Sequence, residues 1–194
     1  YLYMYIGCSI HFAESMDTIG DNIREVQPDV FSAVPRLIEK VFDKIMAKGE
    51  DLTGVKRALF FWAVGLSEEY DVVGKSAFYK MKLAIARKLI FSKWQEALGG
   101  NVKAIASGSA ALQPRLARIF LAADIPILEG YGLTETTAPA TISRPAHIKI
   151  GKVGTPLPGT GVKIADDGEI WLRGNNIMRG YWRNEAATAE VMDG

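Results

Sequence analysis

The segment from Val102 to Leu128 constrains the fold most, because two short apolar runs in it flank one amphipathic pattern. Val102 to Ala106 and Ile125 to Leu128 have the length and composition of buried strands. Pro114 suits the first turn of a helix, and the residues after it form one apolar stripe: Leu116, Ile119, Phe120 and Ala123. A strand, a helix and a strand in this order predict two parallel strands joined by a right-handed crossover.

The preceding residues repeat this alternation. We expect a short strand at Ser9 to Phe12, a helix over Met16 to Val26, a strand at Val30 to Val34 and a helix from Pro35. Asp51 to Leu98 differs, since it contains two long helical patterns that separate near residues 71–74 and end at Gly99-Gly100. We interpret residues 51–98, approximately, as a helical insertion.

From about Gly151, glycine and proline separate short alternating segments, which favours hairpins. The expected strands are Gly161 to Ala165, Glu169 to Arg173 and Ile177 to Tyr181, and Asn184 is expected to cap a final helix. A structural role in the hairpin is expected for Glu169. The predicted fold class is α/β: a parallel sheet with flanking helices and a helical insertion (1–150), followed by part of a small β-barrel-like subdomain (151–194).

Composition narrows the class of protein. The chain has 194 residues, of which 48% are hydrophobic and 23% charged, so it is expected to bury an ordinary globular core. Its formal net charge of +1 gives no overall attraction for nucleic acid, and no run approaches the length of a membrane span. Because Cys8 is the single cysteine, no internal disulfide can form, and a cytoplasmic location is the simplest prediction.

Two loops that follow predicted strands have the composition of a nucleotide site. Ligands of parallel α/β sheets bind at the carboxyl ends of strands, where we expect Gly108-Ser109-Ala110 and the stretch Tyr131 to Thr137. Small residues allow a flat ring to approach the backbone, and Tyr131 offers a face for stacking. The Thr134 hydroxyl suits a phosphate oxygen, and the Glu135 carboxylate suits Mg²⁺. Neither a Walker loop nor a dinucleotide fingerprint is present.

Two ordered motifs resemble the adenylate-forming superfamily, which includes acyl-CoA synthetases, luciferases and nonribosomal adenylation domains. The first is Tyr131-Gly132-Leu133-Thr134-Glu135, and the second is Gly168-Glu169-Ile170-Trp171-Leu172-Arg173-Gly174 with Gly180-Tyr181. Gly151 to Gly159 fits between them. Val34-Pro35-Arg36 and the helical insertion are most similar to the long-chain fatty acid–CoA ligase branch.

The resemblance implies a role for each matching residue. Tyr131 would stack on adenine, and Gly108, Ser109 and Ala110 would line the adenine and acyl pocket. Gly132 would let the backbone turn into the nucleotide, and Thr134 would contact the α-phosphate. Glu135 would hold Mg²⁺ during adenylation. The implied reaction joins a fatty acid to coenzyme A through an acyl-adenylate formed from ATP.

The resemblance also implies that parts of the site lie elsewhere. The family's phosphate loop with its lysine would precede Tyr1, and its ribose-binding aspartate and C-terminal lysine would follow Gly194. Tyr1 stands inside an apolar run and Asp193-Gly194 resembles the opening of a turn, so we expect an internal piece of a longer polypeptide. This piece alone is predicted to be inactive.

Three alternatives remain open from the sequence. The acid could be medium-chain or aromatic, since chain length cannot be read from one wall of a pocket. The chain could instead be a non-catalytic adenine-nucleotide-binding module. The lysine-rich helical stretch around residues 78–94 could contact a partner or an anionic membrane surface, although a solvated basic face is the simpler interpretation.

His11 and His147 lie far apart in sequence and predict no transition-metal site. The oligomeric state is not predictable.

Overall fold

A computed structural model describes residues 2–192, so the predicted turn at Asp193-Gly194 lies outside the described residues. Its five-stranded mixed sheet has the order β1-β2-β3-β4-β5, and a separate two-stranded sheet pairs β6 with β7. The strands are β1 (Val30–Ala33), β2 (Ala104–Ser107), β3 (Ile127–Tyr131), β4 (Thr141–Ile142), β5 (Thr155–Pro156), β6 (Thr160–Ile164) and β7 (Ile170–Gly174).

Helices account for most of the remaining chain. They are α1 (Leu2–Tyr5), α2 (Ile19–Val26), α3 (Pro35–Glu50), α4 (Gly54–Glu68), α5 (Ala77–Ala86), α6 (Ser92–Ala97), α7 (Pro114–Ala122) and α8 (Glu185–Val191). A π-helical stretch, η1 (Arg87–Phe91), joins α5 to α6, and η2 (Thr134–Thr136) and η3 (Pro145–His147) are single 3-10 turns. No helix among residues 2–192 is long and apolar enough to cross a membrane.

The predicted parallel strands are confirmed. β1 pairs in parallel with β2, and β2 pairs in parallel with β3, with Ser107 opposite Glu129 at the carboxyl ends. Helices α3 and α7 both begin at the predicted prolines, Pro35 and Pro114. The sheet continues, however, through antiparallel pairs of β3 with β4 and of β4 with β5, which the sequence did not predict.

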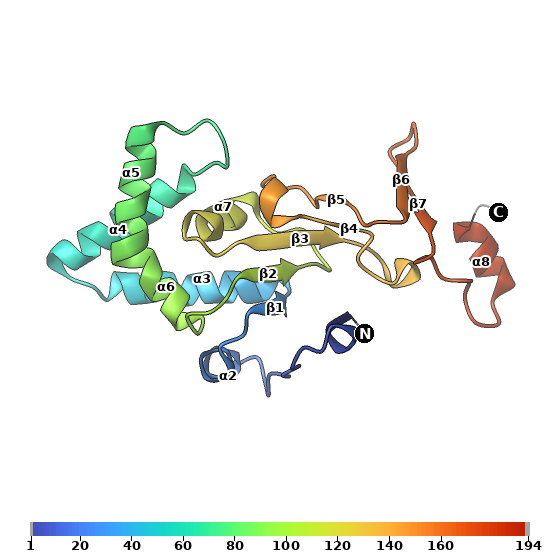
Figure 1. Ribbon diagram of the computed structural model, residues 1–194, viewed down its shortest axis with the longest axis horizontal. Helices are drawn as coiled ribbons and strands as arrows, with labels where there is room; N and C mark the ends of the chain where they lie inside the picture. Colours follow the sequence, from blue (N-terminus) through green and yellow to red (C-terminus); the bar gives the residue numbers. More distant parts are fainter. Residues whose placement is uncertain (1, 193–194) are drawn as a thin grey trace.

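The core lies where the helices meet the parallel strands. Phe120 of α7 is fully buried, and its ring lies 6.5 Å from those of Phe42 and Trp94, centroid to centroid. Trp94 also contacts Phe91 and Phe60, so aromatic packing connects α3, α4, η1, α6 and α7. Figure 1 shows α4 and α5 extending from one end of the sheet, which matches the predicted helical insertion.

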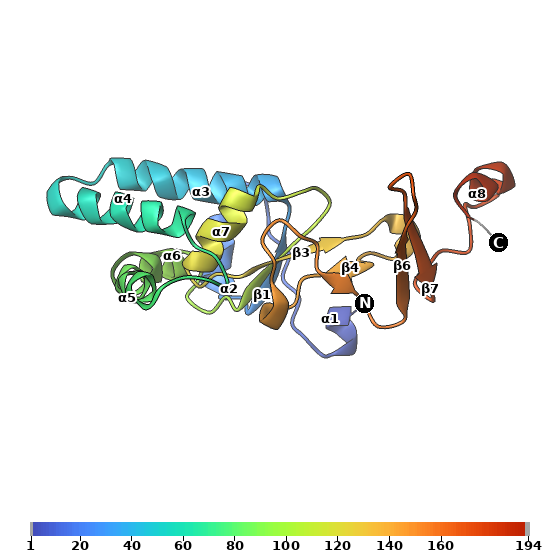
Figure 2. The ribbon, with the colours of Figure 1, turned by 90° about the horizontal axis from the view of Figure 1, so that it is seen from above.

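The second sheet is the predicted hairpin, with Lys163 opposite Trp171. Glu169 accepts a hydrogen bond from the Trp171 indole N–H (2.6 Å), in keeping with the structural role expected for it. Asn184 caps α8 as predicted, because its side chain accepts the Ala187 N–H at 3.1 Å. Figure 2 shows this hairpin and α8 at the end of the molecule opposite to α4 and α5.

Two predicted strands are wrong. Ser9 to Phe12 is exposed and irregular, and no strand pairs with it among residues 2–192. Ile177 to Tyr181 is also irregular, because the Met178 N–H donates to the Glu135 carbonyl (2.8 Å) instead of to a neighbouring strand. β5 lies beyond residue 150 yet belongs to the first sheet, while the domain division at that residue stays a prediction.

Candidate functional site

The loop after β3 is a compact turn. The Thr136 hydroxyl accepts the Leu133 N–H and donates to the Leu133 carbonyl, both at 3.0 Å, and the Ala138 N–H donates to the same carbonyl at 3.2 Å. Thr136 is buried, whereas Thr134 is exposed. The buried Thr136 hydroxyl therefore stabilises the backbone of the turn, and Thr134 remains at the surface.

The loop after β2 lies beside this turn. Ser107 and Glu129 are register partners, and a Cβ added to Gly108 would stand 3.7 Å from the Gly130 carbonyl oxygen. Ser109 has a left-handed backbone (φ 69°), as has Thr137 (φ 52°), a conformation unusual for residues other than glycine. Strained residues of this kind concentrate at binding loops, so both loops have a feature typical of a site.

Gly132 allows two backbone segments to pack closely. Its φ is not in the left-handed region, so the turn does not depend on the conformational freedom of glycine. A Cβ at this position would instead lie 2.9 Å from both Ala140 N and Pro139 Cα. Glycine is needed here because the segment of residues 138–140 passes directly against its backbone.

Glu135 is held by residues distant in sequence. The Tyr181 hydroxyl donates to Glu135 Oε1 at 2.7 Å, and the Met178 N–H donates to the Glu135 carbonyl. The pKa of Glu135 is lowered by its own backbone N–H and then by the Tyr181 hydroxyl, while the hydrogen bond to Glu135 raises the pKa of Tyr181. Both effects favour an ionised carboxylate next to a neutral phenol.

Asn176 makes a second connection to the turn. Its side-chain N–H donates to the Thr136 carbonyl (3.0 Å), and its own carbonyl accepts the Thr137 hydroxyl (2.8 Å). Its side-chain oxygen accepts the Thr160 hydroxyl of β6 at 3.2 Å. We refer to residues 176–181 as the strap, since this segment fixes the turn to the hairpin. The sequence had singled out Gly180-Tyr181 within a motif but had given neither Tyr181 nor Asn176 a role.

A second carboxylate, Glu129, lies beneath the site. It is 8% exposed, and burial raises its pKa, an effect opposed by the backbone N–H groups of Leu112 and Gly151. Its backbone carbonyl accepts the Ser143 N–H at 2.8 Å. The hydroxyl of Ser107, opposite it in register, is buried with no hydrogen-bond partner among the described residues. Sequence patterns assign no role to Glu129, because a carboxylate within an apolar strand leaves no periodic signal.

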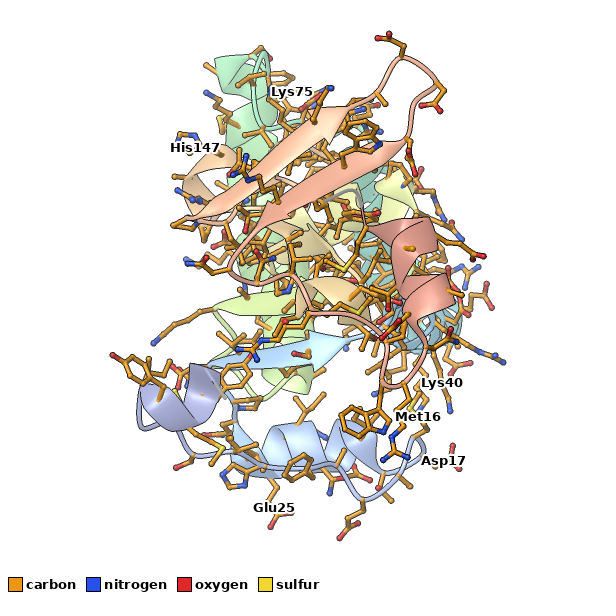
Figure 3. All side chains as sticks on the ribbon, turned by 90° about the vertical axis from the view of Figure 1, so that its right-hand side faces the viewer. Met16, Asp17, Glu25, Lys40, Lys75 and His147 are labelled. Carbon is orange, nitrogen blue, oxygen red and sulfur yellow. The ribbon has the colours of Figure 1, made fainter. Side chains whose placement is uncertain are left out.

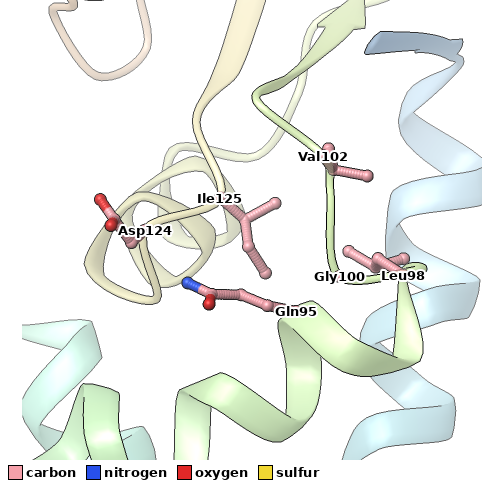
Figure 4. Close-up of a pocket in the computed structure, with 6 residues that line it drawn as sticks. All are labelled: Gln95, Leu98, Gly100, Val102, Asp124 and Ile125. Atoms are coloured by element: carbon pink, nitrogen blue, oxygen red, sulfur yellow. The ribbon is translucent and has the colours of Figure 1, made fainter. Parts of the chain in front are cut away.

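A cavity lies at the other end of the parallel strands. It measures about 190 Å³ and is lined by Gln95, Leu98, Gly100, Val102, Asp124 and Ile125 (Figure 4). The Gln95 amide crosses its edge to donate to the Ala123 carbonyl at 2.9 Å. Since ligands of parallel sheets bind at the carboxyl ends of strands, this cavity at their amino ends does not replace the predicted site.

The residues of the turn fit a magnesium nucleotide by the chemistry of their donors. Mg²⁺ is usually held by one or two carboxylates, with phosphate oxygens and water as its remaining ligands. An ionised Glu135 beside the exposed Thr134 matches this requirement. Among residues 2–192, no group of three His, Cys, Asp or Glu side chains could form a metal site of their own, and His147 lies exposed on η3 (Figure 3).

The fold of this chain is similar to that of adenylate-forming enzyme domains of known structure. The adenylation domain of a carboxylate reductase from Mycobacterium chelonae has a TM-score of 0.63 at 23% identity, covering 93% of this chain and 26% of that one. O-succinylbenzoate CoA synthetase from Bacillus subtilis, in complex with an acyl-adenylate, has a TM-score of 0.62 at 16% identity, with coverages of 99% and 32%.

The family follows from sequence. Residues 1–182 match the model of the AMP-binding enzyme family, and the chain belongs to that family. A long-chain-fatty-acid–CoA ligase of Mycobacterium bovis, FadD15, is 38% identical over 187 residues, covering 94% of this chain and 31% of the relative. Long-chain-fatty-acid–CoA ligase 1 of Cavia porcellus is 34% identical, with coverages of 94% and 27%. The chain thus spans about a third of the curated relatives it matches.

Proposed function

We propose that this chain forms part of an ATP-dependent long-chain fatty acid–CoA ligase and supplies the adenine and magnesium wall of its site. The observation that carries the proposal is the Glu135 carboxylate, held at the end of β3 by Tyr181 in a chain 38% identical to a long-chain ligase. We also propose that the protein is located in the cytoplasm.

In the proposed reaction, an oxygen of the fatty acid carboxylate attacks the α-phosphorus of ATP, and pyrophosphate leaves. The thiolate of coenzyme A then attacks the acyl carbon of the adenylate, and AMP leaves. Tyr131 stacks on adenine, Gly108, Ser109 and Ala110 form the adjoining wall, and the Thr134 hydroxyl donates to the α-phosphate. Glu135 holds Mg²⁺, which, when bound, neutralises charge on the phosphates.

The strap has a positioning role in this proposal. An exposed glutamate side chain samples several rotamers, and ordering it costs conformational entropy. The bonds from Met178 to the Glu135 carbonyl and from Tyr181 to its carboxylate pay part of this cost before the metal binds. The phenol orients the Glu135 carboxylate, which would hold the metal and help to neutralise phosphate charge.

The test is acyl-adenylate formation by the full-length protein across a series of fatty acids of increasing length. Medium-chain and aromatic acids belong in the same series, because these are the alternative substrates. We expect long-chain acids to give the highest kcat/KM. We also expect AMP to be released only when CoA is present. Preference for an aromatic acid would replace the long-chain assignment, and AMP binding without turnover of any acid would favour a non-catalytic module.

The isolated 194-residue chain provides a separate test. We expect it to show no ATP–pyrophosphate exchange, since one wall of a site cannot position a triphosphate for in-line attack. Clear exchange activity from this chain would contradict the expectation.

A further inference from the structure

Helix α5 and the π-helical stretch η1 present an apolar stripe to the outside of the molecule. Its members are Phe78, Met81, Ile85 and Leu89, which are 62%, 53%, 46% and 46% exposed. Their spacing of three, four and four residues places them along one helical face. A contiguous row of large apolar side chains is uncommon on the free surface of a protein and marks a surface that contacts something.

The opposite face of this helix is fixed, so the stripe cannot turn inward. Tyr79, Leu83 and Ala86 are buried against the core, and the Tyr79 hydroxyl donates to the Leu66 carbonyl of α4 at 2.7 Å. Arg87 donates from Nε to the Ala122 carbonyl at the end of α7 (2.8 Å). The apolar stripe is therefore the outward face of a helix attached on two sides.

Basic side chains border the stripe. Lys82 Nζ lies 4.4 Å from the centroid of the Phe78 ring. Lys88 is exposed and stands seven residues, two helical turns, after Met81.

The charge of this region differs sharply from that of the rest of the chain. Residues 72–95 contain six lysines and arginines and no aspartate or glutamate. Because the whole chain has a net charge of +1, the remaining residues carry −5. This region combines basic side chains with a central apolar stripe. It is therefore complementary to a partner that has an anionic outer layer over an apolar interior.

We propose that the outward face of α5 and η1 docks on a phospholipid bilayer that carries anionic headgroups. Phe78, Met81, Ile85 and Leu89 enter the boundary between headgroups and acyl chains, and Lys82 and Lys88 contact the headgroup phosphates. The lysine stems extend along the apolar side chains, so that their ammonium groups reach the plane of the phosphates. This docking does not depend on the proposed ligase activity.

The experiment is co-sedimentation of the full-length protein with vesicles of phosphatidylcholine, with and without phosphatidylglycerol. We expect tight binding to the anionic vesicles alone, weakening steeply as salt is raised. Lys82→Glu/Lys88→Glu should reduce the affinity at least about 25-fold, since each lysine near an anionic surface contributes about five-fold. The matched control, Lys44→Glu/Lys48→Glu, makes the same charge change at two exposed lysines of α3 and should bind as the wild type does apart from a small uniform loss.

Acetylation of lysines separates the competing occupants of this face. In the free protein Lys82 and Lys88 should react readily, and anionic vesicles should protect them. If they are already protected in the free protein, another part of the polypeptide or a second copy covers the face, and the proposal is overturned. Equal binding to both kinds of vesicle, no binding to either, or equal losses in the two double variants would also overturn it.

Discussion

Replacing Gly132 with alanine tests whether close backbone packing sets the shape of the nucleotide loop. The added Cβ would lie 2.9 Å from Ala140 N and from Pro139 Cα, and 3.1 Å from Ala138 Cα. Ordinary contacts begin near 3.4 Å, and backbone atoms cannot rotate away as a side chain can. The segment of residues 138–140 must therefore move by about half an ångström, at a cost of about 1–3 kcal/mol in the free energy of unfolding.

The same displacement should reach the chemistry. Tyr131 precedes Gly132, and Glu135 follows it by three residues in the same turn, so the stacking face and the carboxylate would move with the backbone. Misplacement of this size costs up to about 100-fold in rate, and we expect Gly132→Ala to lower the rate of adenylation by about 10- to 100-fold.

Urea unfolding of the full-length protein measures the change in the free energy of unfolding. Hydrogen exchange resolved by peptide locates the backbone that is destabilised. The matched control is Gly65→Ala, because Gly65 lies inside α4 and an added Cβ there meets no heavy atom within 4 Å. That variant should gain about 0.5–1 kcal/mol through reduced backbone entropy of the unfolded chain. The reasoning fails if Gly132→Ala is as stable as the wild type, or if faster exchange appears away from residues 131–142.

Four further predictions concern single side chains. Glu135→Ala should lower adenylation by about 100-fold with unchanged circular dichroism, and loss of the fold would indicate a structural role instead. Tyr181→Phe should raise the Mg²⁺ concentration needed for half-maximal adenylation, whereas Tyr79→Phe, which also loses one hydroxyl bond, should leave it unchanged. Burial raises the pKa of Glu129 above 4.5, so the folded state binds the carboxyl proton more tightly than the unfolded state does. The wild type should therefore lose stability relative to Glu129→Gln as pH rises from about 4.5 through the raised pKa. A stability difference independent of pH would contradict this. Phe120→Ala should cost about 3–5 kcal/mol in urea unfolding, against less than about 0.5 kcal/mol for Phe12→Ala at an exposed position.

Local signals predicted the parts of the fold that local physics decides. Pro35 and Pro114 begin α3 and α7 because proline lacks only a donor that the first helical turn does not use. The hairpin of β6 and β7 follows from alternation around Asp167-Gly168. By contrast, β4 and β5 have two residues each, too few for any periodicity. β4 forms because the edge of β3 is available to pair with it, and β5 pairs in turn with β4.

The candidate site divides in the same way. The positions of the two strand-end loops were predictable, since parallel strands bring their carboxyl ends to one edge of a sheet. The contacts that orient Glu135 were not, because Tyr181 lies 46 residues further along the chain. Ile177 to Tyr181 is wrongly predicted as a third strand for a related reason: it is a short segment with apolar residues after a hairpin, but its Met178 N–H donates to the turn after β3.

The strap makes the two predicted domains interdependent at the site. Asn176, in the strap, bonds to the Thr136 carbonyl and the Thr137 hydroxyl of the turn and to the Thr160 hydroxyl of the hairpin. One residue therefore joins the strap to both the turn and the hairpin. A division near residue 150 would cut none of the strands of the hairpin, yet it would separate Asn176 from Thr136 and Thr137, and Tyr181 from Glu135. The carboxylate of the proposed metal site is therefore supplied by the turn after β3 and oriented by the strap, so we expect the placement of the hairpin to influence the geometry of the proposed nucleotide wall.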